Sequence, residues 1–153
     1  MTNCQFDNLS MNAKLLELAA DYWACADGDA DKAIGDLFTD DGVLVLGKLT
    51  LTGRAEIERF FKDREVLQQA SKRSTRHVAC NHRIKLLDPG RARVRSTVIV
   101  YVGVGPPPLP SDAPAGIADF DDICVETQAG EWRFARREGR TVFVGPGAAS
   151  FAK

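Results

Sequence analysis

Two stretches of the chain carry side chains that together could transfer a proton. The first contains Tyr22 and Asp27, and the second, residues 75–84, contains both histidines, His77 and His82. An imidazole that shares a hydrogen bond with a carboxylate is a common general base, because the carboxylate fixes the ring tautomer and stabilises the imidazolium that forms. The sequence therefore poses one spatial question, which is whether the fold brings Asp27 to His77.

Tyr22 and Asp27 lie near the end of a predicted helix. From Met11 onward, apolar residues recur at steps of three and four, which is the spacing of an amphipathic helix. Ser10 can cap its start, and Gly28 suits the left-handed residue that follows a helix end. Tyr22 lies on the apolar stripe, where a tyrosine often packs with its hydroxyl satisfied, so both a packing role and a site role stay open.

His77 lies in a predicted strand, residues 76–87. The side-chain period of two places His77, Ala79 and Asn81 on one face of that strand and His82 on the other. Asn81 is therefore a candidate to bind the same substrate as His77. A strand histidine is also often only a satisfied structural residue, so its role depends on which groups surround it.

The other segments predict an α+β domain. A short second helix is expected at 31–38 and a third helix at 53–70, and the Pro-rich segment 105–116 is expected to be a loop. The remaining predicted strands are 43–46, 49–52, 91–104, 120–127, 131–138 and 141–144. Three N-terminal helices against a strongly curved antiparallel or mixed sheet leave a cone, and its open end is where a small-molecule pocket forms.

Length, charge and cysteine content exclude several classes of protein. The 153 residues suit one domain, 1–153 with a core of about 9–144, and 20 basic against 21 acidic residues leave a net charge of −1. This balance predicts neither nucleic acid nor a membrane surface as a partner. The scattered cysteines argue against a zinc site and favour free thiols in the cytoplasm. The first ten residues lack a secretion signal, and no run approaches the ~18 apolar residues that span a bilayer.

Four motifs, in this order and spacing, carry a family resemblance. They are the Tyr-x-x-x-x-Asp of residues 22–27, Leu-Thr-Gly-Arg-Ala-Glu-Ile at 51–57, Arg-His-x-x-x-Asn at 76–81, and Glu-Trp-Arg-Phe-Ala-Arg-Arg at 131–137. Over roughly residues 9–144 the chain resembles the SnoaL-like branch of the nuclear transport factor 2-like superfamily. It is similar in particular to the group that contains scytalone dehydratase, bile-acid 7α-dehydratase and lindane dehydrochlorinase.

The resemblance implies a conical α+β barrel and assigns roles to several residues. His77 would be the base, Asp27 its carboxylate partner, and Tyr22 the group that polarises a substrate oxygen. An arginine near the chain end would complete the pocket, with Arg140 the first choice and Arg137 the second. The resemblance also implies that no metal or organic cofactor is needed and that the chain forms a homo-oligomer, either a trimer or a dimer.

The implied reaction is a dehydratase-type elimination on a small apolar hydroxy-carbonyl or ring compound. Apolar walls would come from residues such as Phe60 and Trp132. An isomerase, polyketide cyclase or epoxide hydrolase could use the same pocket. A non-catalytic ligand-binding or oligomerisation module, such as the small subunit of a ring-hydroxylating dioxygenase, is the competing class. Light scattering and a search for a co-purifying large subunit distinguish that module from a self-sufficient oligomer.

Overall fold

The computed structural model of the chain describes residues 3–149, with side chains from residue 8 onward. Its helical elements are α1 (Asn3–Asp27), a 3₁₀ turn η1 (Ile34–Leu37) and α2 (Arg54–Ser71). Its strands are β1 (Phe38–Leu46), β2 (Leu49–Thr52), β3 (Arg73–Asp88), β4 (Arg91–Val104), β5 (Gly116–Glu126) and β6 (Trp132–Val144). Strands β2 and β4 have the bounds predicted from the sequence.

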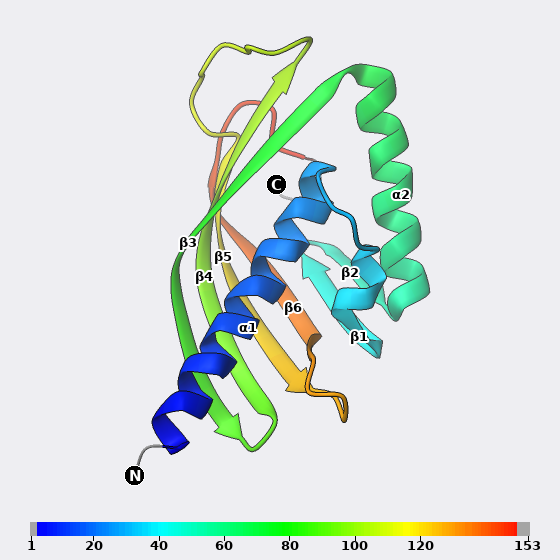
Figure 1. The fold of residues 1–153 in the computed structure, drawn as a ribbon. Coiled ribbons are helices and arrows are strands. Elements are labelled where there is room, and N and C mark those ends of the chain that lie inside the picture. The colour runs from blue at the N-terminus through cyan, green and yellow to red at the C-terminus, as the bar shows by residue number, and fades with distance from the viewer. Residues whose placement is uncertain (1–2, 150–153) are drawn as a thin grey trace.

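The strands form one mixed sheet of six strands in the order β2-β1-β6-β5-β4-β3 (Figure 1). Strands β1 and β6 run parallel, and the other neighbouring pairs are antiparallel. The predicted barrel is wrong in one respect, because the sheet is not closed: β2 and β3 lie at its two edges and do not pair. Helix α2 contacts both edge strands, so a helix rather than a row of hydrogen bonds joins the two sides.

The described residues contain two α-helices, where the sequence predicted three. Residues 31–38 were expected to be helical, but only the single 3₁₀ turn η1 forms there, and Phe38 is already extended at φ −110° and ψ 156°. One such turn is enough to bury Ile34 and Leu37, which are three residues apart. Helix α1 also begins earlier than Ser10, because no helix-breaking residue lies between Asn3 and Ser10.

The core lies between the helices and the covered face of the sheet. On β4 the predicted alternation is confirmed, since Ala92, Val94 and Val98 are buried while the arginines between them are exposed. The apolar stripe of α1 is confirmed as well. Its buried members are Leu15, Leu18, Ala19, Tyr22, Trp23 and Ala26. Helix α1 runs across the sheet (Figure 1). Asp27 at its end is bonded to Thr75 and His77 of β3.

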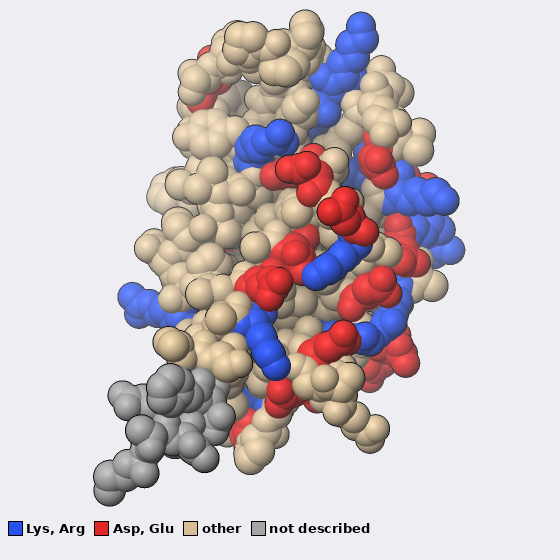
Figure 2. Space-filling view, viewed as in Figure 1, with Lys and Arg blue, Asp and Glu red and all other residues tan. Residues whose placement is uncertain are grey.

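Acidic and basic side chains are interspersed with one another over the centre and right of the face seen in Figure 2, and its left side is largely uncharged. This mixture agrees with the net charge of −1, and no field of a single sign covers that face. Among residues 3–149, no helix is long and apolar enough to cross a membrane.

Candidate active site

A cavity of about 590 Å³ lies between α1, α2 and the sheet face that the helices cover. Most of its wall is apolar, with Phe60 and Phe61 from α2 facing Val100, Val102 and Ala118 from the sheet. Its polar lining residues include Tyr22, Arg64, Gln68, Arg73, Thr75 and His77. A cavity of this size and character suits a small apolar molecule that carries a few polar groups.

The structure brings Asp27 and His77 together at this cavity. The ring Nδ1 of His77 lies 2.6 Å from Oδ1 of Asp27, and the backbone N–H of His77 donates to Oδ2 at 2.9 Å. The hydroxyl of Thr75 donates to Oδ1 at 2.8 Å. Because Asp27 accepts all three bonds, the neutral His77 ring carries its proton on Nδ1 and presents an unprotonated Nε2.

Asp27 is held in its charged form although its carboxylate is partly buried. Burial raises the pKa of Asp27, but hydrogen bonds from the ring and backbone of His77 and from Thr75 outweigh burial and leave it below its ordinary value. A carboxylate that stays ionised in a half-buried site can stabilise an imidazolium formed beside it. The pair therefore has the electrostatics of a general base.

Trp23 fixes the plane of the His77 ring. The two rings stack with centroids 4.6 Å apart and an interplanar angle of 21°, and Trp23 in turn packs edge-on against Phe120. Among the described residues, Nε2 of His77 has no hydrogen-bond partner, and it lies on the far side of the ring from Asp27. This nitrogen is therefore the one available to a molecule in the cavity that His77 lines.

Tyr22 also lines the cavity, within a cluster of aromatic rings. Burial raises the pKa of Tyr22 to about 12, an effect that the positive charge of Arg137 partly opposes. The hydroxyl therefore keeps its proton at neutral pH. A neutral hydroxyl is a hydrogen-bond donor that can stabilise negative charge developing on a substrate oxygen.

Arg137 lies one layer behind the cavity and does not line it. Its Nη1 donates to Oδ2 of Asp122 at 2.6 Å, and the two side chains are 0% and 1% exposed. Its guanidinium lies over the rings of Tyr22, Phe134, Phe120 and Trp23, at 4.0, 4.6, 4.7 and 4.9 Å. Arg137 thus supports three cavity-lining rings, Tyr22, Trp23 and Phe120, from behind, while it pairs with Asp122 on the neighbouring strand β5.

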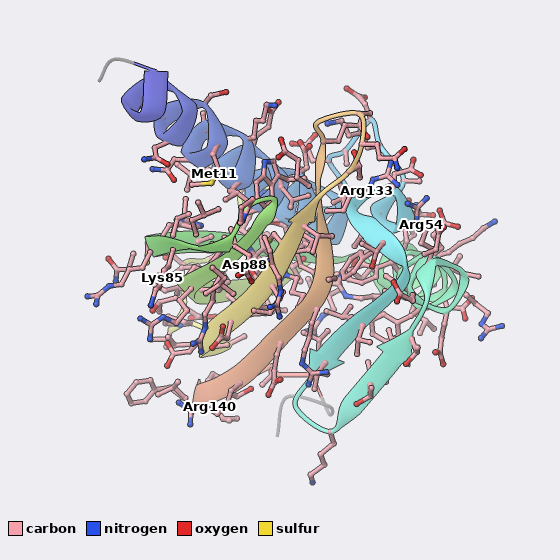
Figure 3. The ribbon with its side chains drawn as sticks, turned by 90° about the horizontal axis from the view of Figure 1, so that it is seen from below. Met11, Arg54, Lys85, Asp88, Arg133 and Arg140 are labelled. Atoms are coloured by element: carbon pink, nitrogen blue, oxygen red, sulfur yellow. The ribbon has the colours of Figure 1, made fainter. Side chains whose placement is uncertain are left out.

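Arg140, expected to enter the pocket, points outward instead. Its side chain is 81% exposed, 3.9 Å from Asp119 on the neighbouring strand, and Figure 3 shows it near the end of β6, directed away from the sheet. Trp132 is buried in the core, at the opposite end of β6 from the cavity-lining Thr141. Neither residue lines the cavity, which corrects the sequence-based assignment of both.

Asn81 is likewise outside the cavity. It adopts a positive φ of 55° where the register of β3 against β4 shifts between Cys80 and Arg83. Such an irregularity breaks the period of two, so Asn81 no longer shares a face with His77. Its side chain is exposed.

Two further cavity residues, Thr75 and Arg64, could have been identified from the spacing of residues in the sequence. Thr75 lies two positions before His77 and thus on the same face of β3. Arg64 follows Ile57 and Phe60 by seven and four positions, which places it on the buried stripe of α2. Nη1 of Arg64 donates to the carbonyl of Ala26 at 2.5 Å and Nη2 to Oγ1 of Thr75 at 3.4 Å.

No group of three or more His, Cys, Asp or Glu within the described part of the chain is arranged to hold a metal ion. The chain's described cysteines, Cys25, Cys80 and Cys124, are free thiols. Burial raises the pKa of Cys124 strongly, which keeps this thiol protonated.

Known proteins share this fold at low sequence identity. A proposed scytalone dehydratase from Novosphingobium aromaticivorans is 23% identical, with 93% of this chain and 91% of that chain covered and a TM-score of 0.74. A type 2 hexachlorocyclohexane dehydrochlorinase, LinA, is 15% identical, with coverages of 95% and 94% and a TM-score of 0.75. An NTF2-like protein from Novosphingobium aromaticivorans is 21% identical, with coverages of 98% and 94% and a TM-score of 0.76.

No curated protein matches the chain. The family model of the SnoaL-like domain, however, matches residues 7–138, a span that includes the Asp27–His77 pair and nearly all of the sheet. The chain therefore belongs to the SnoaL-like domain family and has the nuclear transport factor 2-like fold.

Proposed function

We propose that the chain is a cofactor-independent lyase that eliminates water from a small apolar hydroxy-carbonyl compound, with His77 as the general base. The observation that carries this proposal is the 2.6 Å contact between His77 and Asp27 at the wall of an apolar cavity. A non-catalytic module of the same fold has no need for a half-buried dyad with a free ring nitrogen beside a cavity. Structures with this fold include a proposed scytalone dehydratase and a hexachlorocyclohexane dehydrochlorinase as well as a protein of unknown function.

The proposed reaction uses two residues that line the cavity, His77 and Tyr22, and Asp27, which is bonded to His77. Nε2 of His77 takes a proton from the carbon next to a carbonyl group, and Asp27 stabilises the imidazolium that results. The hydroxyl of Tyr22 donates a hydrogen bond to the carbonyl oxygen, where negative charge builds. The electron pair then forms the carbon–carbon double bond as hydroxide leaves from the adjacent carbon. The imidazolium returns its proton to that hydroxide, so water departs and His77 is neutral again.

The names of the structural relatives favour elimination over the other reactions of such pockets. A dehydratase removes water and a dehydrochlorinase removes hydrogen chloride. Both reactions require a base that takes a proton from one carbon while a leaving group departs from another. The dyad meets that shared requirement, and the homo-oligomer implied by the family resemblance remains part of this proposal.

Asp27→Asn is the first test of this function. A panel of β-hydroxy ketones and β-hydroxy acids with apolar bodies is incubated with the protein, and loss of one water is followed by mass spectrometry. The wild type is expected to form the unsaturated product, and Asp27→Asn to lower kcat by on the order of 10²–10⁴-fold. The exposed Asp29 supplies the control, because Asp29→Asn is expected to leave turnover unchanged. A substrate that wild type and Asp27→Asn convert equally fast would exclude the dyad as the base.

A further inference from the structure

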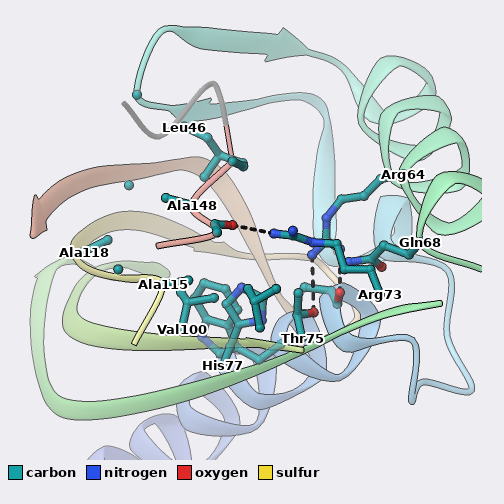
Figure 4. A pocket seen from close by; sticks show the side chains of 18 of the residues that line it. Leu46, Arg64, Gln68, Arg73, Thr75, His77, Val100, Ala115, Ala118 and Ala148 are labelled. Atoms are coloured by element: carbon teal, nitrogen blue, oxygen red, sulfur yellow. Dashed lines mark hydrogen bonds between the residues drawn. The ribbon is translucent and has the colours of Figure 1, made fainter. Parts of the chain in front are cut away.

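Two guanidinium groups lie at the same end of the cavity. Arg64 comes from α2 and Arg73 from the start of β3, and both line the cavity with Gln68 beside them (Figure 4). Both side chains are half-buried. Burial lowers the pKa of Arg64, and the nearby positive charge of Arg73 acts in the same direction. Like charges held together away from water are unfavourable unless an anion offsets them.

Neither arginine forms a direct ion pair with a carboxylate of the described residues, although the charge of Asp27, which Arg64 reaches through Thr75, partly opposes the fall in the pKa of Arg64. Neither guanidinium has an Asp or Glu oxygen within 4.0 Å. Asp63 lines the cavity as well, but it is exposed and forms no ion pair with either arginine. Seven other arginines have carboxylate partners, namely Arg54, Arg91, Arg93, Arg133, Arg136, Arg137 and Arg140. The remaining arginines without an ion pair among the described residues are exposed, unlike Arg64 and Arg73; they are Arg59, Arg76, Arg83 and Arg95.

The neutral contacts of the two arginines leave most of their donors unused. Arg64 donates to the carbonyl of Ala26 and to the hydroxyl of Thr75, and Arg73 donates to the carbonyl of Gly147 at 2.8 Å. A guanidinium has about five N–H donors in a planar fork that matches a carboxylate. The contact with Ala26 explains Arg64 in part as a cap for the end of α1. It does not explain why a second positive charge lies beside it.

We propose that Arg64 and Arg73 bind a carboxylate group of the ligand, so that the protein takes small apolar carboxylic acids. This substrate class rests on the proposed lyase function, whereas the anion site itself does not. The carboxylate lies at the arginine end of the cavity, and the apolar body lies along Val100, Val102 and Ala118. The anion site adjoins the dyad through Thr75, which bonds both Arg64 and Asp27. A bound acid therefore has its carbon skeleton close to His77.

Binding of 2-naphthoate and its uncharged analogue 2-naphthamide, measured by isothermal titration calorimetry, tests the anion site. Charge-assisted hydrogen bonds to a carboxylate are expected to make wild-type affinity for the acid on the order of tenfold to a hundredfold higher than for the amide. Arg64→Gln and Arg73→Gln are each expected to remove most of that preference. Arg59→Gln, which changes an exposed arginine on the same helix, is expected to keep it.

The binding test separates the anion site from the catalytic proposal. His77→Gln and Asp27→Asn are expected to retain the preference for the acid, since neither change removes an arginine. Equal affinities for acid and amide in the wild type, or no measurable binding of the acid, would overturn the anion site and leave the dyad untouched. If Arg64→Gln fails to fold without its contact to α1, the affinities of the wild type for the acid and the amide still test the anion site.

Discussion

Replacing His77 by glutamine is expected to lower kcat/KM by on the order of 10²–10⁴-fold, the contribution of a positioned acid–base group. Glutamine has a similar reach and can still donate a hydrogen bond to Asp27, but it cannot take a proton from a substrate carbon. Far-ultraviolet circular dichroism is expected to be unchanged, because His77 contacts the rest of the fold mainly through Asp27 and the Trp23 ring. The assay follows initial rates on the hydroxy-carbonyl compound that the wild type converts.

His82 provides the matched control for this change. It is the other histidine of the chain and lies on the same strand, but it does not line the cavity. His82→Gln is therefore expected to keep wild-type turnover. If His77→Gln retained activity equal to that of His82→Gln, the proton would have to be removed by another group, and the proposed mechanism would be rejected.

At a pH above the value of about 7 to which burial raises the pKa of Asp122, Asp122→Asn is expected to destabilise the fold by about 3–5 kcal/mol, the cost of removing one member of a buried ion pair. Arg137 would keep its charge, because an arginine does not lose its proton in a protein. That charge would remain 0% exposed with aromatic rings as its main neighbours. Since whole domains are stable by only about 5–15 kcal/mol, urea unfolding should show a large fall in the midpoint.

Arg137→Met is expected to cost less than Asp122→Asn at low pH, because the remaining Asp122 can take up a proton. Burial already raises the pKa of Asp122 to about 7, although Arg137 opposes the shift. A carboxyl group with a raised pKa favours the folded state below its ordinary pKa, and this contribution is lost as pH rises through the folded value. Without Arg137 the folded pKa rises further. The stability of Arg137→Met should therefore fall relative to wild type as pH increases beyond about 7.

The double change Asp122→Leu with Arg137→Met is expected to recover most of the lost stability. It removes both charges together, and apolar replacements of a buried pair are often neutral in their effect. Unfolding free energies of the single and double variants form a double-mutant cycle. Additive losses in the double variant would show that the two side chains do not act as a pair.

Much of the fold could be predicted from periodicity. The helical spacing before Ala26 and the alternation on β4 both reflect one covered and one exposed face, which a sequence pattern records directly. Closure of the sheet could not be predicted in this way. It depends on whether the edge strands β2 and β3 meet, and the contact of both with α2 is a property of three-dimensional packing.

The residues of the candidate site also include some that the sequence could predict and some that it could not. Asp27 and His77 were predictable candidates, but their meeting rests on α1 crossing the sheet to β3, which a family resemblance implied and local pattern alone did not. Asn81 was misplaced because its positive φ interrupts an alternation that the sequence presents as regular. The late arginines were misassigned because Arg140 lies on the exposed face of β6, whereas Arg137 lies on the buried face but pairs with Asp122 outside the cavity. Arg64 was visible on the buried stripe of α2, but its function depends on partners from two other elements.

The tautomer of His77 tests the dyad most directly. Imidazole ¹⁵N NMR of the labelled protein reports which ring nitrogen carries the proton, and with only two histidines in the chain, His82→Gln assigns both sets of signals. In the neutral ring of the wild type, the proton is expected on Nδ1, held by Asp27, with Nε2 unprotonated, and Asp27→Asn is expected to lose this preference. A wild-type ring protonated on Nε2, or a tautomer unchanged by Asp27→Asn, would contradict the role assigned to the pair.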